Sequence, residues 1–142
     1  MFALLIANRF TLETKPVFFA ICSLHAREYS PAELCTRFAE KLVSGYGNDP
    51  DITTLVDYHE IHLVLQGNPD GRKMAEAGYL WRKNKNNRYC SDKNVDAKGY
   101  AKGRGIDLNR NFPVGFGIED GSEECDLTFH GPAAYPSPRV ER

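Results

Sequence analysis

Residues 17–24 read VFFAICSL and are apolar at seven of eight positions. A nearly continuous apolar run of this length, rich in strand formers, is typical of a strand buried on both faces of a sheet. Residues 58–66, YHEIHLVLQ, form a second strand candidate that ends at a turn sequence. Residues 2–7 and Gly105–Leu108 are weaker strand candidates.

A helix is predicted between the two main strands. Ser30 can cap its first turn and Glu33 lies three residues later, which is the pattern of a capping box. Its apolar face repeats at helical spacing through Leu34, Phe38 and Leu42. Gly45 ends it, and residues 72–77 are predicted to form a short helical turn. Strands that alternate with helices predict an α/β fold, here a partial mixed β-sheet with flanking helices.

The composition is that of one ordinary globular domain, with 142 residues of which 42% are hydrophobic and 26% charged. A net charge of −1 gives no electrostatic case for a nucleic acid or an anionic membrane as partner. The apolar runs are too short to span a bilayer. The residues from Trp81 to Gly105 are rich in Lys, Arg, Asn and Gly, and are predicted to form a long exposed loop.

The four cysteines lack the close spacing of a zinc knuckle or a redox motif. Cys22 and Cys35 lie in apolar patterns and are predicted to be plain buried thiols. Cys90 and Cys125 lie in polar, loop-like sequence that is compatible with a disulfide. Such a bond would favour an extracellular or periplasmic location, because it needs an oxidising compartment.

Polar residues follow three of the strand candidates at their carboxyl ends, where ligands bind in open α/β sheets. These residues are His25, Asn68 and Asn109. His25 and Glu28 are three residues apart, so a turn can direct an imidazole and a carboxylate at one metal ion. Each feature alone also fits an ordinary polar surface.

Two arginines add to this chemistry. Arg82 could polarise a carbonyl or stabilise an oxyanion near a metal. Asn109 and Arg110 place an amide beside a guanidinium, which suits recognition of a carboxylate. The sequence has no nucleophile elbow, phosphate loop or dinucleotide fingerprint.

Five stretches in order resemble the zinc metallocarboxypeptidases of peptidase family M14, the carboxypeptidase A and B group. They are PVFFAICSLHARE (16–28), NPDG (68–71), WRKN (81–84), DLNRNF (107–112) and CDLTFHGP (125–132). The resemblance implies that residues 1–142 are the front half of a carboxypeptidase-like α/β/α catalytic domain. The domain would be truncated at its carboxyl end and also at its amino end.

The resemblance also implies a role for each matching residue. His25 and Glu28 correspond to two ligands of one Zn²⁺, and Arg82 to the arginine that polarises the scissile carbonyl. Asn109 and Arg110 correspond to the pair that binds the terminal carboxylate of a peptide or protein substrate.

Two further correspondences concern the surroundings of the site. Arg27 corresponds to an arginine of an outer substrate subsite. Cys90 and Cys125 correspond to positions that form a disulfide in animal members of the family.

The family's third zinc ligand and its catalytic glutamate come from beyond residue 142. The resemblance therefore implies that this chain alone is inactive or nearly so, with an incomplete zinc site. Two alternatives remain open, a non-catalytic module that binds peptide carboxyl termini and a related zinc amidase or deacylase. Half of a mixed sheet also predicts self-association through an exposed sheet edge.

Overall fold

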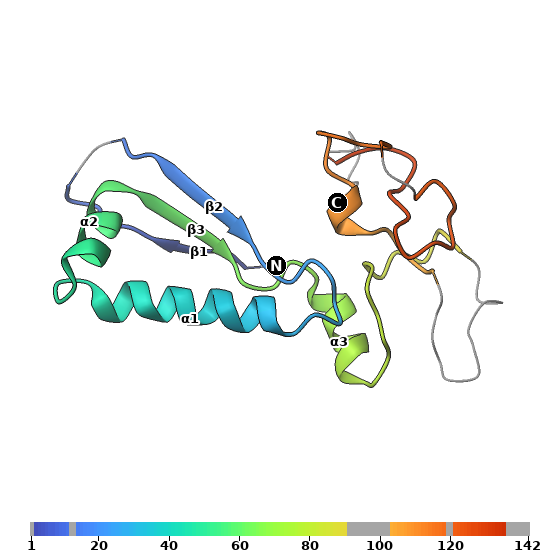
Figure 1. The fold of residues 1–142 in the computed structure, drawn as a ribbon, viewed down its shortest axis with the longest axis horizontal. Helices are drawn as coiled ribbons and strands as arrows, with labels where there is room; N and C mark the ends of the chain where they lie inside the picture. The colour runs from blue at the N-terminus through green and yellow to red at the C-terminus, as the bar shows by residue number, and fades with distance from the viewer. Residues whose placement is uncertain (1, 12–13, 91–102, 119–120, 136–142) are drawn as a thin grey trace. The chain divides into compact units, whose positions relative to one another are not determined.

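The computed structural model describes residues 2–11, 14–90, 103–118 and 121–135 (Figure 1). The elements, in chain order, are β1 (Leu4–Ile6), β2 (Val17–Ile21), α1 (Ser30–Gly45), α2 (Pro50–Tyr58), β3 (Glu60–Val64), α3 (Pro69–Glu76) and the 3-10 helix η2 (Leu108–Arg110). They fall into two compact units. Met1–Ser23 and Tyr29–Gly67 form the first unit, and Leu24–Glu28 and Asn68–Arg142 form the second.

The first unit is a three-stranded mixed sheet with helices against it, which confirms the predicted α/β class. The strand order is β1-β3-β2, with β1 antiparallel and β2 parallel to the central β3. The core lies between the sheet and the helices. It consists of Ala39, Leu42, Ile52, Val56, Ile61 and Leu63. These residues come from α1, α2 and β3, so the helices cover the face of the sheet to which Ile61 and Leu63 point.

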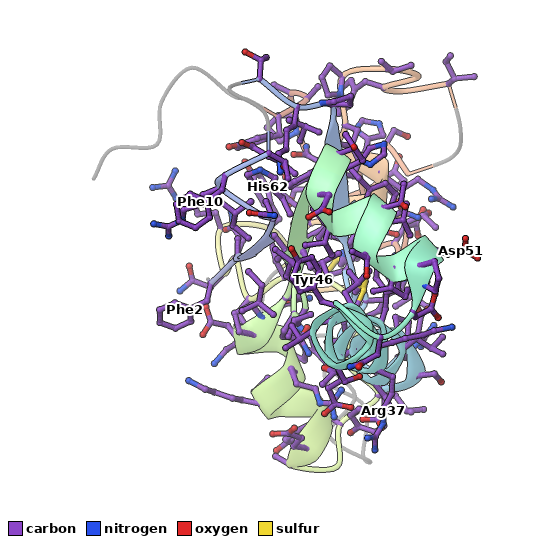
Figure 2. All side chains as sticks on the ribbon, turned by 90° about the vertical axis from the view of Figure 1, so that its left-hand side faces the viewer. Phe2, Phe10, Arg37, Tyr46, Asp51 and His62 are labelled. Atoms are coloured by element: carbon purple, nitrogen blue, oxygen red, sulfur yellow. A yellow bond between two sulfur atoms is a disulfide. The ribbon has the colours of Figure 1, made fainter. Side chains whose placement is uncertain are left out.

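The prediction that β2 is buried on both faces is wrong. Phe18 packs edge-on against Phe38 of α1, with ring centroids 6.4 Å apart. Val17 and Phe19 alternate to the opposite face and are exposed, as is Leu5 of β1. No described element of the first unit covers that face. The apolar run of β2 therefore contributes exposed apolar side chains to an uncovered face of the sheet. Phe2 and Phe10 also project from the ribbon, at 94% and 95% exposure (Figure 2).

Helix α1 confirms the predicted helix but not its capping box. Tyr29 is the N-cap and makes no side-chain cap bond, while Ser30 is already helical. The short helix α2 is not predicted from the sequence above. Asp49 caps it, accepting hydrogen bonds from the amides of Asp51 and Ile52, and Pro50 follows at the first helical position.

Cys22 and Cys35 form a disulfide in the first unit, so the prediction of two plain thiols is wrong. Cys22 lies just after β2 and Cys35 lies on α1. The packing of the helix on the sheet brings their Cα atoms to 6.4 Å, within the range that a disulfide spans.

The second unit has little regular structure beyond α3 and η2 in its described part. A small buried cluster in this unit consists of Ala26, Ala75 and Trp81. Ala26 comes from Leu24–Glu28, the first segment of the unit. Gly105–Leu108 is not a strand, because Leu108 opens η2 and Gly105 takes a positive φ of 87°. The predicted exposed loop is also wrong in part, since Trp81, Lys83 and Cys90 are buried. Its residues 91–102 lie outside the described residues.

Within the described residues, no helix combines the length and apolar character needed to cross a membrane.

Candidate active site

The candidate site begins in a tight turn of the second unit. The amide of Glu28 donates to the carbonyl of His25 at 3.1 Å, which closes a turn over residues 25–28. Ala26 inside this turn is fully buried against Trp81, which fixes the turn to the rest of the unit. The turn brings His25 Nδ1 and Glu28 Oε1 to 3.0 Å. Arg27 lies in the same turn and is half-buried.

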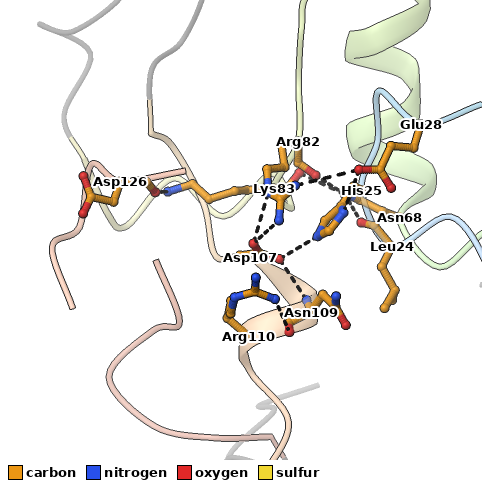
Figure 3. Close-up of polar contacts among 10 residues, drawn as sticks. All are labelled: Leu24, His25, Glu28, Asn68, Arg82, Lys83, Asp107, Asn109, Arg110 and Asp126. Atoms are coloured by element: carbon orange, nitrogen blue, oxygen red, sulfur yellow. Dashed lines mark hydrogen bonds and ion pairs between the residues drawn. The ribbon is translucent and has the colours of Figure 1, made fainter. Parts of the chain in front are cut away.

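Asp107 is the central residue of the site, although the sequence patterns predict no role for it there. Its carboxylate is fully buried. Oδ1 accepts from His25 Nε2 at 2.9 Å and from the amide of Asn109 at 2.9 Å. Oδ2 accepts from Nε and Nη2 of Arg82 at 3.1 and 2.8 Å. One carboxylate therefore orients the imidazole, the guanidinium and the first turn of η2 (Figure 3).

Arg82 lies between two carboxylates. Nε and Nη2 bind Asp107, and Nη1 lies 3.8 Å from Glu28 Oε1. The guanidinium side chain is only 14% exposed, whereas the Glu28 side chain is 46% exposed. Asp107 thus fixes the Nε and Nη2 side of the guanidinium, and Nη1 faces Glu28, a candidate metal ligand.

His25 and Glu28 fit the chemistry of a zinc site. A carboxylate accepts, so the bond to Asp107 places a proton on His25 Nε2, and in that tautomer Nδ1 is the ring nitrogen with a lone pair on the Glu28 side. Two acceptors at 3.0 Å repel unless a proton or a cation lies between them. Histidine nitrogen and carboxylate oxygen are both ligand types that zinc takes in proteins, so the pair would suit one such ion. A carboxylate on the far nitrogen is the partner that zinc-binding histidines commonly have.

The metal-ligand set is only partial in the described part of the chain. No group of three His, Cys, Asp or Glu side chains that could hold a metal ion occurs there. Asp107 does not complete the set, since it lies on the Nε2 side of the imidazole. The residues present therefore fit two of the three protein ligands of a catalytic zinc.

Asn109 and Arg110 lie on η2, beside a pocket of about 300 Å³. Asp107 caps η2 through the amide of Asn109, which places the pair directly after the central carboxylate. Arg110 Nη1 donates to the carbonyl of Asn109 at 3.1 Å. The other lining residues are Phe112, Val114, Gly115, Gly117, Ile118 and His130. The pocket thus combines a guanidinium and an amide with an apolar wall.

Cys90 and Cys125 are joined as a disulfide in the second unit, with Cα atoms 4.9 Å apart. Beside it lies Lys83, whose side chain is 2% exposed. Its ammonium donates to the carbonyls of Gly103, Glu124 and Asp126, the last two of which flank Cys125. Burial lowers the pKa of Lys83 to about 8, and the nearby carboxylates of Asp107 and Asp126 oppose that shift.

The profile of the zinc carboxypeptidase family, peptidase family M14, matches residues 3–142. The chain belongs to the zinc carboxypeptidase family. Human carboxypeptidase A5 is 33% identical over 130 residues, which cover 88% of this chain and 27% of the relative. The chain thus spans little more than a quarter of the length of that curated carboxypeptidase.

Solved zinc carboxypeptidase structures also align with almost the whole chain. Carboxypeptidase A from Helicoverpa armigera superimposes with a TM-score of 0.76 and 28% identity, over 96% of this chain and 31% of that one. Thrombin-activatable fibrinolysis inhibitor superimposes with a TM-score of 0.73 and 25% identity, over 96% of this chain and 32% of that one. The α/β fold of this chain therefore matches part of the carboxypeptidase fold.

Proposed function

We propose that this chain carries the amino-terminal part of a zinc-dependent carboxypeptidase site, which acts on the carboxyl-terminal peptide bond of peptides or proteins. The observation that carries the proposal is the buried Asp107 carboxylate. It binds the Nε2 of His25 on one oxygen and the guanidinium of Arg82 on the other. Family membership supports the reaction class.

In this proposal His25 and Glu28 would hold a zinc ion. Asp107 accepts from Nε2, so Nδ1 would be the ring nitrogen that coordinates it. A zinc ion bound there would supply Lewis acidity toward a peptide carbonyl and a water molecule. The short spacing between Nδ1 and Glu28 Oε1 supports both as ligands of one ion.

Arg82 would stabilise the negative charge that develops on the scissile carbonyl oxygen. Its buried edge is already bound to Asp107, so little reorganisation is needed when that charge forms. Its Nη1 lies near Glu28, where a carbonyl next to the metal would be found. This placement argues against the alternative of a zinc amidase or deacylase, since the resemblance assigns such an arginine to carboxypeptidases.

Asn109 and Arg110 would bind the free carboxylate of the substrate's last residue. A guanidinium and an amide that line a pocket of about 300 Å³ match a carboxylate in charge and in hydrogen-bonding capacity. Binding the carboxylate there positions the last peptide bond for hydrolysis. Arg27, in the turn that carries the ligands, would contact the substrate further along its chain.

We further propose that the chain alone is inactive or nearly so. A catalytic zinc needs three protein ligands and a general base, and the described residues offer two ligands. The same observation favours a second candidate function, a module that binds peptide carboxyl termini without cleaving them. The Cys90–Cys125 disulfide supports an extracellular location for either function.

The test uses acetylated dipeptides that end in phenylalanine, lysine or glutamate, each with a free or an amidated carboxyl terminus. The proposal expects the free acid to bind, the amide not to bind, and binding to be lost in Arg110→Ala but kept in the exposed control Arg88→Ala. Equal binding of acid and amide would contradict the carboxylate role. Turnover by the chain that a chelator abolishes would contradict the predicted inactivity.

A further inference from the structure

Asn68 opens the NPDG stretch and takes no part in the proposed chemistry, yet it is only 3% exposed. Its carboxamide nitrogen donates to the carbonyl of Leu24 at 3.1 Å and to the carbonyl of Lys83 at 2.9 Å. A third, longer contact of 3.4 Å reaches the carbonyl of Arg82. One side chain therefore binds the residue before His25 and the residue after Arg82 (Figure 3).

A backbone bond completes this link. The amide of Ala26, directly after His25, donates to the carbonyl of Arg82 at 3.0 Å. The backbones that carry His25 and Arg82 are thus bound to each other next to both residues. Their side chains in turn meet on opposite oxygens of Asp107. The result is a closed frame, with Asn68 at the backbone end and Asp107 at the side-chain end.

The other half of the Asn68 side chain is also used. Oδ1 accepts from the amide of Gly71 at 3.0 Å and so caps helix α3. A Cβ on residue 71 would lie 2.6 Å from this oxygen, so glycine is needed for the close approach. The cap fixes which way the carboxamide faces, because Oδ1 points to α3 and the nitrogen must point to the three carbonyls.

We propose that Asn68 is the positioning residue that holds the backbones of His25 and Arg82 side by side. The distance between Arg82, the proposed carbonyl-polarising arginine, and His25, the proposed first metal ligand, is then fixed. The importance of that separation for catalysis rests on the proposed function, but the frame itself does not. A carboxamide fits this role because its nitrogen donates to carbonyls on one side while its oxygen accepts from a backbone amide on the other.

The decisive variant is Asn68→Asp, which keeps the shape and the cap acceptor but turns a buried oxygen toward three carbonyls. Asn68→Ser is a milder variant that keeps a capping oxygen and removes the carboxamide nitrogen that reaches the three carbonyls, in case the first does not fold. Asp70→Asn, an exposed isosteric change in the same helix turn, is the matched control. Leu42→Ala, in the core of the other unit, controls for a loss of stability that leaves the frame intact.

Two signals report on the frame without metal or activity. Hydrogen exchange of the Ala26 amide reports on its bond to Arg82, and the ring ¹⁵N spectrum of His25 reports which nitrogen carries the proton. The proposal expects Ala26 protection to fall about tenfold or more in Asn68→Asp, with a smaller fall in Asn68→Ser, after correction for global stability. It also expects the Nε2-protonated signature of His25 to weaken in both variants but not in either control.

Unchanged Ala26 protection and an unchanged His25 tautomer in the folded Asn68 variants would overturn the proposal. The same losses in Leu42→Ala would also overturn it, because they would then reflect stability alone. A Zn²⁺ titration of the same proteins separates this proposal from the proposed function. If the wild-type chain binds no zinc through His25, the proposed function fails, while the two metal-free signals still decide the role of Asn68.

Discussion

The imidazole of His25 and the carboxylate of Asp107 are joined at 2.9 Å across 82 positions of sequence. This bond selects the ring nitrogen that faces Glu28 and links the proposed zinc ligands to Arg82 through a single buried carboxylate. The proposed chemistry of the second unit would therefore depend on a residue outside the proposed metal-ligand and carboxylate-binding pairs.

Replacing Asp107 by asparagine should disturb stability and metal binding together. The amide would present N–H donors to a site that already holds three donor groups, His25 Nε2, the Arg82 guanidinium and the backbone amide of Asn109. We expect a loss of about 3 kcal/mol or more in the free energy of unfolding and a zinc affinity about 10–100-fold lower. Urea denaturation and zinc titration measure the two effects, with Asp70→Asn as control. An Asp107→Asn protein with wild-type zinc affinity would contradict the role given to Asp107.

Lys83 should make stability depend on pH in the alkaline range. Its pKa is about 8 in the folded chain, below the ordinary lysine value of 10.5. Between these values the unfolded chain binds more protons, so this lysine's contribution to the free energy of unfolding rises as pH rises. Relative to Lys83→Met, we expect the free energy of unfolding of the wild type to rise by less than about 1.4 kcal/mol per pH unit. Urea denaturation from pH 7.5 to 10 tests this, and the exposed control Lys85→Met should keep the wild-type slope.

The Cys90–Cys125 disulfide should protect the amine of Lys83. Two of the carbonyls that bind this amine belong to the neighbours of Cys125. We expect the double serine variant to lose about 2–4 kcal/mol of stability. Acetylation by a water-soluble reagent, read by mass spectrometry, should modify Lys83 slowly in the oxidised chain and at nearly the rate of exposed Lys85 after reduction. Equal protection of Lys83 in both redox states would show that the Cys90–Cys125 disulfide does not protect the Lys83 amine.

The open face of the sheet predicts self-association of the isolated chain. Val17 and Phe19 are exposed on that face, and β2 is an edge strand of the described sheet. Sedimentation velocity should find dimers or larger species. Phe19→Lys should shift these species toward monomer, whereas Thr54→Lys, at an exposed position of α2, should not. A monodisperse wild-type monomer with a cooperative thermal transition would refute this prediction.

Local patterns in the sequence predicted part of the geometry of the proposed site. His25 and Glu28 lie within one turn, so their spacing alone predicted that they could face one ion. The helix over Ser30–Gly45 and the central strand β3 were also predictable, since each has a periodic or continuous apolar pattern. These features depend on neighbours in sequence, which a single chain reveals.

Features that depend on distant neighbours were not predictable in this way. The partners of Asp107 lie 82 and 25 positions away, and in the sequence it stands only as an acidic residue before Asn109. The Cys22–Cys35 pairing requires the packing of α1 on the sheet. Helix α2 did carry a local signal, Asp49 followed by Pro50, but its β-branched residues favour a strand by propensity alone.

The most direct test of the central claim is a Zn²⁺ titration of the purified chain by calorimetry, with the variants His25→Ala, Glu28→Gln and, as control, His59→Ala. The account predicts weak one-to-one binding that is lost in His25→Ala and Glu28→Gln and kept in His59→Ala, because the described residues supply two ligands of three. Zinc binding that persists unchanged in His25→Ala and Glu28→Gln would show that this turn is not the metal site.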